Sequence, residues 1–407
     1  MFHIRFASLV LAASLCGLFS TAQAAEGALI DSADELSFIQ PKAKGSVEVV
    51  EGKVGKAQKL SFEDGCTSIF IPAQKIKGTP EWDKAAGFSF WVKGDGSDKC
   101  GGIQFIWNED YALRYDYCFP IKSTDWQKVT VKWSDLVCVL PEADGKMSSI
   151  GPNANAPSKL GRLQFGKWWY WKDYGKHSYI VDEFRLEPAI EDAKVEKPAG
   201  APLDRVLAKL KAGKPITIVT MGDSLTDFNH WANKKANWPT MLQNALREKF
   251  KSEVTIINPA IGGTQLRQGS MMIPRWIQKA PEPDLVTIAY GYNDFDSKMR
   301  GPNFKDTYLA TIDRVRRFTQ NKSDILVIGT APAATRWTEM QEMCDAAKAA
   351  AAEKGAGFVD LHAIFHEAGK ENKDRLYASA EDKTHLGAPG HELVAKGVVE
   401  AIEKAGK

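Results

Sequence analysis

The sequence predicts two domains of different fold classes: an N-terminal all-β sandwich of the jelly-roll type and a C-terminal three-layer α/β domain with a parallel sheet. Short runs that alternate apolar and polar residues fill residues 25–189, whereas buried-strand patterns alternate with helical patterns in residues 203–407. Period-two alternation is typical of antiparallel sheets, and repeated β-α units indicate a parallel sheet covered by helices. Residues 190–202, charged and rich in Ala, Pro and Gly, are expected to be a linker.

Residues 1–24 have the pattern of a secretory signal peptide. His3 and Arg5 precede an apolar stretch over residues 6–19, and Ala22 to Ala24 form a small-residue cleavage site. The apolar stretch is too short for a comfortable membrane span. We therefore expect cleavage after Ala24 and an exported protein, secreted or periplasmic, that does not insert into a membrane.

Composition narrows the partners and cofactors. The 407 residues carry a formal net charge of +2 and are 44% hydrophobic, which suits two domains with their own cores. This balance gives no reason to expect nucleic acid as a partner. No zinc-ligand or phosphate-loop spacing occurs, so neither a catalytic metal nor a cofactor is expected, although a structural calcium in the first domain would leave little trace in the sequence. The sequence predicts no particular oligomeric state.

The cysteines fall into two groups. Cys16 would leave with the signal peptide, and the other four cysteines of the first half are Cys66, Cys100, Cys118 and Cys138. Because export favours oxidation, disulfides are expected among these four, with three connectivities open. Cys344 lies in an Ala-rich helical pattern and is expected to be a buried structural thiol.

The N-terminal domain shows several strand patterns and one dense aromatic cluster. Strands are expected at residues 87–92, 103–107, 126–131 and 179–184. The aromatic run over residues 167–174 contains Trp168, Trp169 and Trp171, which are candidates for glycan binding because sugar C–H faces stack on aromatic rings. The alternative is that these rings fill the core, although neighbours in one strand cannot all face inward.

The C-terminal domain opens with its most informative stretch. A β-branched run from Ile216 to Met221 stops at Gly222, Asp223 and Ser224. Such a run is typical of a buried parallel strand, and ligands of open α/β sheets bind beyond the carboxyl ends of the strands. Ser224 is therefore a candidate nucleophile. The alternative is an ordinary turn in which Asp223 and Ser224 bond to nearby backbone.

Further β-α units follow along the chain. Strands are expected at residues 254–257, 285–290, 325–329 and 357–360, and helices at residues 203–210, 241–250, 308–318, 340–354 and 389–404. Three titratable residues in this half, Asp360, His362 and His391, fall outside the motifs described next, and we expect them to be structural.

Three later blocks accompany the Gly-Asp-Ser-Leu motif. They run from Asn258 to Thr264, from Gly291 to Asp294, and from Asp382 to Leu386. In this order the four blocks resemble those of the SGNH, or GDSL-type, hydrolase family of esterases and lipases. The resemblance covers about the second half of the chain and implies a flavodoxin-like arrangement of the C-terminal domain.

The resemblance also implies a role for each motif residue. Ser224 would be the nucleophile, His385 the base and Asp382 the group that orients the base. Gly263, Asn293 and the Ser224 backbone N–H would form the oxyanion hole, with the adjacent Gly262 as an alternative to Gly263. These residue types suit ester chemistry, because a serine hydroxyl needs a base and the tetrahedral intermediate needs donors already in place.

The predicted function is that of an exported serine esterase. By pattern the N-terminal domain looks like carbohydrate-binding jelly-roll modules of secreted glycan-active enzymes, so the substrate is expected to be an acylated glycan. The protein would remove O-acetyl groups from a polysaccharide through an acyl-enzyme on Ser224. A peptidoglycan O-acetylesterase, a lipase or arylesterase, a non-catalytic glycan-binding protein and an O-acyltransferase are the alternatives.

Overall fold

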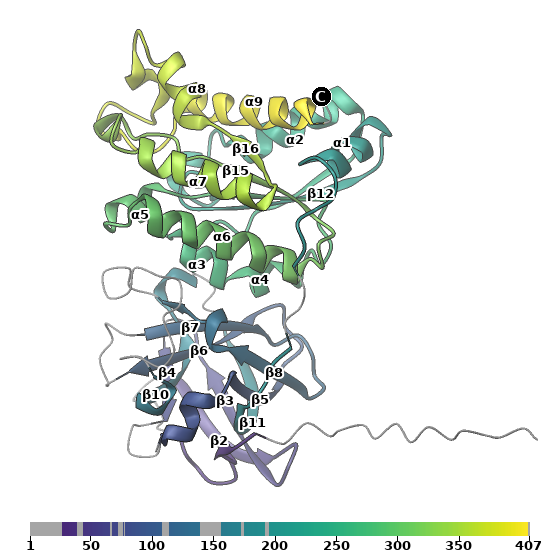
Figure 1. The fold of residues 1–407 in the computed structure, drawn as a ribbon, viewed down its shortest axis with the longest axis vertical. Coiled ribbons are helices and arrows are strands. Elements are labelled where there is room, and N and C mark those ends of the chain that lie inside the picture. The colour runs from purple at the N-terminus through teal and green to yellow at the C-terminus, as the bar shows by residue number, and fades with distance from the viewer. Residues whose placement is uncertain are drawn as a thin grey trace, which may run out of the picture.

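The chain folds into two domains that lie one above the other in Figure 1, an N-terminal β domain and a C-terminal α/β domain. The computed structural model describes residues 27–38, 44–65, 67–71, 76, 78–107, 114–138, 156–171, 175–191 and 195–405. The predicted signal peptide and Cys66 lie outside these residues. None of the helices in the described ranges has the length and apolar character needed to cross a membrane.

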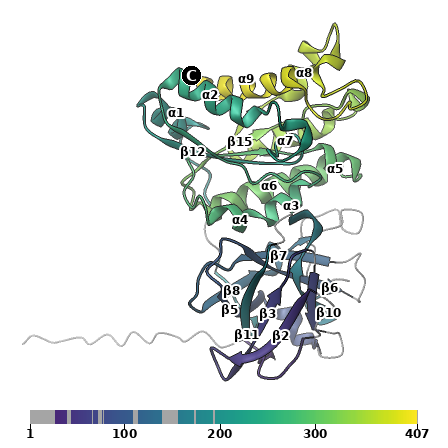
Figure 2. The ribbon, with the colours of Figure 1, turned by 180° about the vertical axis from the view of Figure 1, so that it is seen from behind.

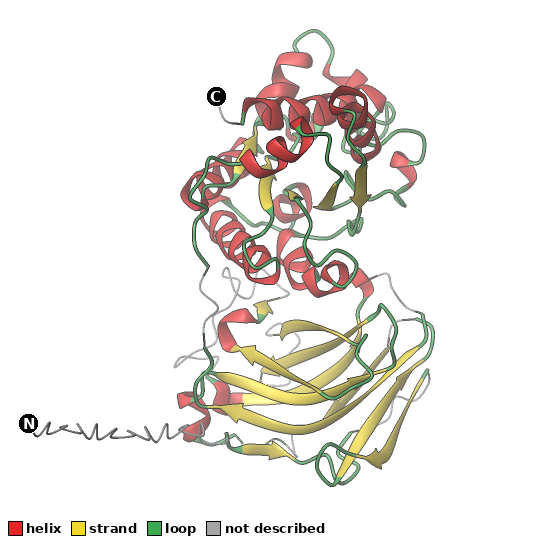
Figure 3. Cartoon of the chain, turned by 90° about the vertical axis from the view of Figure 1, so that its right-hand side faces the viewer, coloured by secondary structure: helices red, strands yellow, loops and turns green. Residues whose placement is uncertain are grey.

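Two antiparallel sheets make up the N-terminal domain (Figure 3). The first has the order β2-β3-β11-β5-β8, with β1 paired to β11, and its strands are β1 (Leu29–Asp31), β2 (Gly45–Glu51), β3 (Lys56–Phe62), β5 (Gly87–Gly94), β8 (Gln127–Lys132) and β11 (His177–Glu187). The second has the order β4-β10-β6-β7-β9, and its strands are β4 (Thr67–Ile71), β6 (Cys100–Trp107), β7 (Arg114–Pro120), β9 (Val137–Cys138) and β10 (Leu160–Lys167). The four strands expected in this domain are confirmed as β5, β6, β8 and β11.

The two sheets share an aromatic core. Phe88 of β5 meets Phe105 of β6 edge to face, with ring centroids 5.3 Å apart, and Phe90 meets Phe165 of β10 at 5.8 Å. Phe184 of β11 packs among the same rings. Each of these side chains is buried, so the alternating residues that predicted strands also supply the contacts between the sheets. The jelly-roll connection of these strands stays a prediction.

The C-terminal domain is built on a parallel sheet. Its order is β13-β12-β14-β15-β16, and its strands are β12 (Ile216–Gly222), β13 (Val254–Ile257), β14 (Leu285–Ala289), β15 (Asp324–Ile328) and β16 (Gly357–Val359). Every neighbouring pair is parallel. In chain order this is 2-1-3-4-5, the flavodoxin-like arrangement that the motifs imply.

Helices cover both faces of this sheet (Figures 1 and 2). The face turned away from the N-terminal domain carries α1 (Asp204–Lys211), α2 (Trp238–Phe250), α8 (Leu361–Ala368) and α9 (Ala388–Lys404). The other layer contains α3 (Leu266–Met271), α4 (Ile273–Ile277), α5 (Tyr292–Asp296), α6 (Gly301–Phe318) and α7 (Gln341–Lys354). Short 3-10 helices span Pro80–Lys84, Trp133–Asp135, Pro157–Lys159, Trp169–Trp171, Trp231–Asn233, Ala334–Arg336 and Lys373–Leu376.

The β12 strand shows why both faces need helices. Ile216 and Ile218 belong to the hydrophobic core under α1, α2 and α9, whereas Val219 and Met221 belong to the core under α3 and α6. Alternate residues of one strand therefore feed two separate cores. Because both faces of β12 are buried, its sequence is a near-continuous apolar run and not a strict alternation of apolar and polar residues.

The aromatic cluster of residues 167–174 does not continue a strand. β10 ends at Lys167 and the chain turns into the 3-10 helix Trp169–Trp171. Trp168 is 8% exposed and Trp171 is 2% exposed, and both pack against Met271 and Met272 of the C-terminal domain. Stacking on a glycan needs an open ring face, so this burial contradicts the expected glycan-binding role of these two rings. The side chain of Trp169 lies outside the described part of the structure.

Polar contacts join the two domains beside this cluster. Arg317 and Asp135 form an ion pair of 2.6 Å, and the buried Arg314 donates a hydrogen bond to the backbone carbonyl of Asp135. Arg267 of α3 donates to the carbonyl oxygen of Cys138 at 3.1 Å. The N-terminal domain is therefore packed against the helices of the C-terminal domain and is not connected to it by the linker alone.

The structure does not show the expected disulfides among the cysteines that it describes in this domain. Cys100, Cys118 and Cys138 are buried and are not joined to one another by disulfides. In the β6–β7 pair Cys100 faces Pro120 and Cys118 faces Gly102, so the two cysteines are diagonal neighbours. Their side chains are nevertheless in contact, and burial together with the neighbouring Cys100 thiol raises the pKa of the Cys118 thiol.

Cys344 is a buried free thiol, as expected. Its Sγ atom lies 3.4 Å from Asp360 Oδ1, and burial raises the pKa of the thiol to about 12. A thiol with such a pKa is a poor nucleophile, which fits a structural role.

Candidate active site

The candidate nucleophile lies where β12 ends. The chain turns sharply after Gly222, and a Cβ atom at this glycine would lie 2.3 Å from the Thr226 hydroxyl, so a larger residue does not fit. Asp223 accepts the Leu225 N–H at 3.0 Å and closes the turn. Ser224 follows with only 8% of its surface exposed. Its position at the carboxyl end of a central parallel strand is the one expected from the sequence.

Ser224, His385 and Asp382 are connected by hydrogen bonds. The Nε2 atom of His385 lies 3.0 Å from Ser224 Oγ, and its Nδ1 atom lies 2.7 Å from Asp382 Oδ2. The two contacts use opposite ring nitrogens. This arrangement allows the imidazole to take the serine proton while the carboxylate stabilises the resulting imidazolium.

The Asp382 to His385 segment holds this geometry through its own backbone. Asp382 Oδ1 accepts the N–H groups of Thr384 at 3.0 Å and His385 at 2.9 Å. Partial burial opposes ionisation of Asp382, but these two N–H donors and the His385 ring outweigh it and lower the pKa of the carboxyl. The group is therefore charged near neutral pH, as an orienting carboxylate must be.

The Gly262-Gly263 turn lies beside the nucleophile. Gly263 has φ +82°, a conformation that favours glycine, and it is exposed. The Gly262 N–H is bonded to Asp227 Oδ2 at 3.0 Å. Within the described ranges no protein acceptor is bonded to the backbone N–H of Gly263 or of Ser224. Of the two glycines, Gly263 is thus the one with a donor available to a substrate.

Asn293 reaches the same region from α5. Its Nδ2 atom donates to the carbonyl oxygen of Thr264 at 2.9 Å, which ties the amide to the residue after Gly263. The second hydrogen of the same amide group is left for another acceptor. Asp294, the next residue, accepts the Leu266 N–H at 3.0 Å, and burial raises the pKa of its carboxyl to about 7. These bonds link α5 to the beginning of α3.

Two asparagines hold the nucleophile loop: Asn233, which the sequence did not single out, and Asn258, the first residue of the second block. Asn233 donates to the carbonyl oxygens of Ser224 at 2.7 Å and Asp227 at 2.8 Å. Asn258 donates to Thr226 O at 2.9 Å. The Asn233 amide is buried and has two carbonyl partners, so moving it is costly. The only sequence signal of Asn233 is a polar residue in a loop that follows an apolar strand.

Two more unpredicted residues contact the His385 ring. His230 stacks on it with ring centroids 4.3 Å apart and an interplanar angle of 29°. Trp231 meets it edge to face at 5.7 Å. A Cβ atom on Gly262 would lie 3.2 Å from the His230 ring, so His230 sits between the imidazole and the glycine turn.

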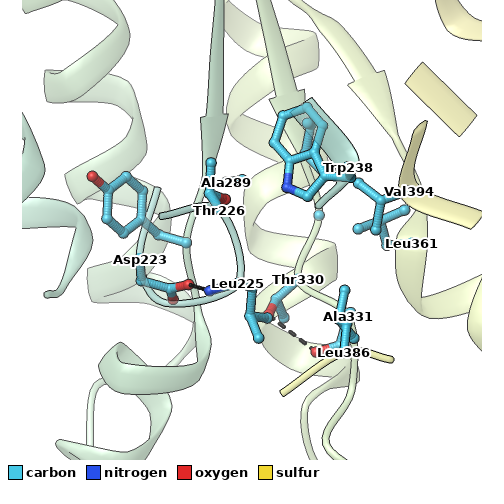
Figure 4. A pocket seen from close by; sticks show the side chains of 13 residues that line it. Asp223, Leu225, Thr226, Trp238, Ala289, Thr330, Ala331, Leu361, Leu386 and Val394 are labelled. Carbon is cyan, nitrogen blue, oxygen red and sulfur yellow. Dashed lines mark hydrogen bonds between the residues drawn. The ribbon is translucent and has the colours of Figure 1, made fainter. Parts of the chain in front are cut away.

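A small cavity lies behind the nucleophile loop (Figure 4). Asp223, Thr226, Trp238 and Thr330 are among the residues that line it, whereas Ser224 is not. Burial raises the pKa of Asp223 to about 7. The cavity thus separates the loop from the α9 layer and is not part of the surface that Ser224 presents.

The three titratable residues expected to be structural make contacts of that kind. Asp360 caps α8 by accepting the Ala363 N–H at 2.9 Å. His391 accepts the Trp238 N–H at 3.3 Å, and His362 Nε2 lies 3.0 Å from the carbonyl oxygen of Trp337. Across the part of the chain that the structure describes, no group of three His, Cys, Asp or Glu residues could hold a metal ion.

A flavodoxin-like sheet with a hydrogen-bonded serine, histidine and aspartate at its carboxyl edge, beside free backbone donors, defines a hydrolase domain of the serine type. Residues 220–393 match the GDSL-like Lipase/Acylhydrolase family, and the C-terminal domain is a GDSL-like hydrolase domain. A comparison with curated proteins finds no match.

Solved structures similar to this chain include esterases. An acetylxylan esterase from Geobacillus stearothermophilus is 22% identical to this chain, with a TM-score of 0.37. The alignment covers 47% of this chain and 96% of the esterase. A lipase/acylhydrolase from Enterococcus faecalis is 20% identical, covers 46% and 95%, and has a TM-score of 0.38. A two-domain esterase active on acetylated mannans is 21% identical, covers 51% and 54%, and has a TM-score of 0.42. At such identities the substrate of this chain is an independent question.

Proposed function

We propose that the protein is a carbohydrate O-acetylesterase that removes acetyl groups from a polysaccharide through an acyl-enzyme on Ser224. The continuous hydrogen-bonded set Asp382, His385 and Ser224 carries the proposal. It supplies a nucleophile, a base and an orienting carboxylate in one place.

The first half of the reaction follows from these contacts. Ser224 Oγ attacks the ester carbonyl carbon while His385 Nε2 takes the serine proton. The carbonyl oxygen becomes an oxyanion and accepts hydrogen bonds from the Gly263 and Ser224 N–H groups and from Asn293 Nδ2. The intermediate then collapses, the carbon–oxygen bond to the alcohol breaks, and His385 returns its proton to the leaving oxygen.

The second half regenerates the serine. A water molecule loses a proton to His385 and attacks the acyl carbon, and a second oxyanion occupies the same three donors. Breaking the bond to Ser224 Oγ releases the carboxylic acid, and the serine recovers its proton from His385. Asp382 stays ionised throughout, because its lowered pKa keeps it charged at neutral pH.

Two observations support a sugar ester over a long-chain lipid ester. The side chains that contact the His385 and Gly262 region are polar or aromatic, namely Asp227, His230 and Trp231. These suit a hydroxyl-rich alcohol better than an extended hydrocarbon chain. The antiparallel two-sheet domain joined to the hydrolase domain is the second support, by analogy with glycan-active enzymes.

The test is acetate release from a panel of acetylated polysaccharides by the purified protein, with a nitrophenyl acetate as the small-ester reference. The proposal expects release from at least one polysaccharide, and loss of activity in folded Ser224→Ala and His385→Ala variants on every substrate. Turnover of the small ester without release from any polysaccharide would reject the carbohydrate assignment and leave a general esterase.

Export belongs to the same proposal. A polysaccharide substrate lies outside the cytoplasm, which agrees with the signal-peptide pattern of residues 1–24. N-terminal sequencing of the protein recovered from culture medium or periplasm is expected to begin at Ala25. Recovery of the full chain with Met1 in the cytoplasm would contradict it.

A further inference from the structure

Trp231 is unusually exposed for a tryptophan. It is 62% exposed, more than any other large apolar side chain in the described ranges. Exposing an indole ring to water costs free energy that burial would recover. The ring nevertheless lies 5.7 Å from the His385 ring, centroid to centroid, beside the residue that would transfer the proton.

The backbone of Trp231 is held firmly relative to Ser224. The residue begins the short 3-10 helix Trp231–Asn233, and the Asn233 amide bonds the carbonyl oxygens of Ser224 and Asp227. The His230 N–H donates to Asp227 O at 3.1 Å. Ser224 and Trp231 therefore lie in one loop, and hydrogen bonds within that loop fix the position of one relative to the other. The Trp231 ring also contacts the His230 ring, with centroids 5.4 Å apart, and yet the residue stays 62% exposed.

The interaction that this geometry offers is stacking. A pyranose ring presents a face of C–H groups that packs on an aromatic ring while its hydroxyls stay in water. The neighbouring residue Asn229 is exposed and offers an amide to such hydroxyls. Other rings near His385 serve less well, since His230 already stacks on the catalytic imidazole.

We propose that Trp231 is the platform for the sugar ring that carries the scissile ester, and that it positions this ring against His385 and Ser224. The inference rests on the proposed function and makes it more specific, because it assigns the recognition of a pyranose ring to the catalytic domain itself. A hydrolase domain that binds its sugar in this way needs no contribution from Trp168 or Trp171, which are buried between the domains.

The experiment compares two kinds of acetate ester with the full-length protein. One is a set of mono-acetylated methyl pyranosides, and the other is ethyl acetate, which has no ring to stack. The variants are Trp231→Ala, which removes the platform, and Trp231→Phe, which keeps an aromatic face. Trp91→Ala is the matched control, because Trp91 is a half-buried tryptophan on β5 of the other domain.

Stacking that holds the ground state predicts a loss in KM rather than kcat. Trp231→Ala is expected to lower kcat/KM on the best acetylated pyranoside about 5- to 10-fold more than on ethyl acetate, mainly through KM. Trp231→Phe should recover most of the loss, and Trp91→Ala should behave as wild type.

Each contrary outcome has its own meaning. If the wild-type protein cleaves acetylated pyranosides and Trp231→Ala cleaves them equally well, the platform is rejected while the carbohydrate function stands. If Trp231→Ala slows both kinds of ester alike, the residue only supports His385 and stacking is also rejected. If the wild-type protein cleaves ethyl acetate but none of the acetylated sugars, the proposed function fails and the platform fails with it.

Discussion

At the scale of single residues, the sequence located the proposed reacting groups but not the residues that hold them in place. Ser224, Asp382 and His385 were predictable because the chemistry demands these residue types, and the structure brings the three into hydrogen-bond contact. The choice between Gly262 and Gly263 needed geometry, since it depends on which N–H Asp227 already occupies. His230 and Trp231 could not be predicted, because nothing in their local sequence specifies that they pack against a residue more than 150 positions away.

Asn293 gives a prediction at this scale. Replacing it with Ala removes one oxyanion donor, so kcat on a small ester is expected to fall about 100- to 1000-fold while KM changes little. Steady-state kinetics on a nitrophenyl acetate measures both constants. Asp296→Ala, an exposed change in the same short helix, is the matched control and should be near wild type. An effect of Asn293→Ala confined to KM would remove this amide from the oxyanion hole.

At the scale of elements, the strands of both domains were predicted correctly where the spacing of apolar residues along the sequence matches the residues that are buried. The five strands of the parallel sheet and the helices around them fall close to the expected ranges, because apolar runs on β12, β14 and β15 supply two cores at once. The aromatic run after Lys167 was wrongly interpreted as part of a strand. Tryptophan has strand propensity, but here the residues form a 3-10 turn at the domain interface. The rings of this turn pack against Met271 and Met272, and these tertiary contacts cannot be predicted from the sequence.

The link between α5 and α3 gives a prediction about pH. Burial raises the pKa of Asp294 to about 7, above the value near 3.9 of an unfolded aspartate. The folded state therefore binds the proton more tightly. Its stabilising contribution is complete below about pH 4 and is lost as the pH rises toward 7.

Asp294→Asn keeps an acceptor for the Leu266 N–H but cannot titrate. Its free energy of unfolding is expected to depend less on pH between about 4 and 7 than that of the wild-type protein, by about 1.4 kcal/mol for each unit of pKa shift. Urea unfolding across this range is the measurement, and the exposed Asp296→Asn is the control. Parallel curves for Asp294→Asn and the wild type would show that Asp294 does not carry the shifted pKa.

At the scale of the whole molecule, the interface between the domains changes the role expected for the N-terminal domain. The sequence suggested a tethered glycan-binding domain, but Trp168 and Trp171 pack against the end of α3 and are not exposed to a glycan. That helix follows directly after the Gly262-Gly263 turn. The N-terminal domain is thus packed against the helix that follows the proposed oxyanion-hole turn, and no sequence pattern indicates such a contact because its two sides are about 100 residues apart.

The ion pair at this interface provides a stability prediction. Asp135→Ala removes the carboxylate near Arg314, which is 5% exposed, and Arg317, which is 26% exposed. Losing the partner of largely buried cations is expected to cost about 1–3 kcal/mol in the free energy of unfolding. Glu282→Ala breaks the exposed pair with Lys322 and should change stability by less than about 1 kcal/mol. Equal effects of the two changes in urea unfolding would mean that the interface pair adds no more than a surface pair.

The central claim is that Ser224 carries the acyl group, and mass spectrometry of the intact protein tests it most directly. Incubation with a nitrophenyl phosphonate, which phosphonylates activated serines with loss of nitrophenol and leaves an adduct that water removes slowly, should add the mass of one phosphonyl group to the full-length protein. Peptide mapping should place that mass on Ser224, and Ser224→Ala should take up none. His385→Ala should react far more slowly, because the serine then lacks its base. A stoichiometric adduct on another residue, or equal labelling of Ser224→Ala, would contradict the account.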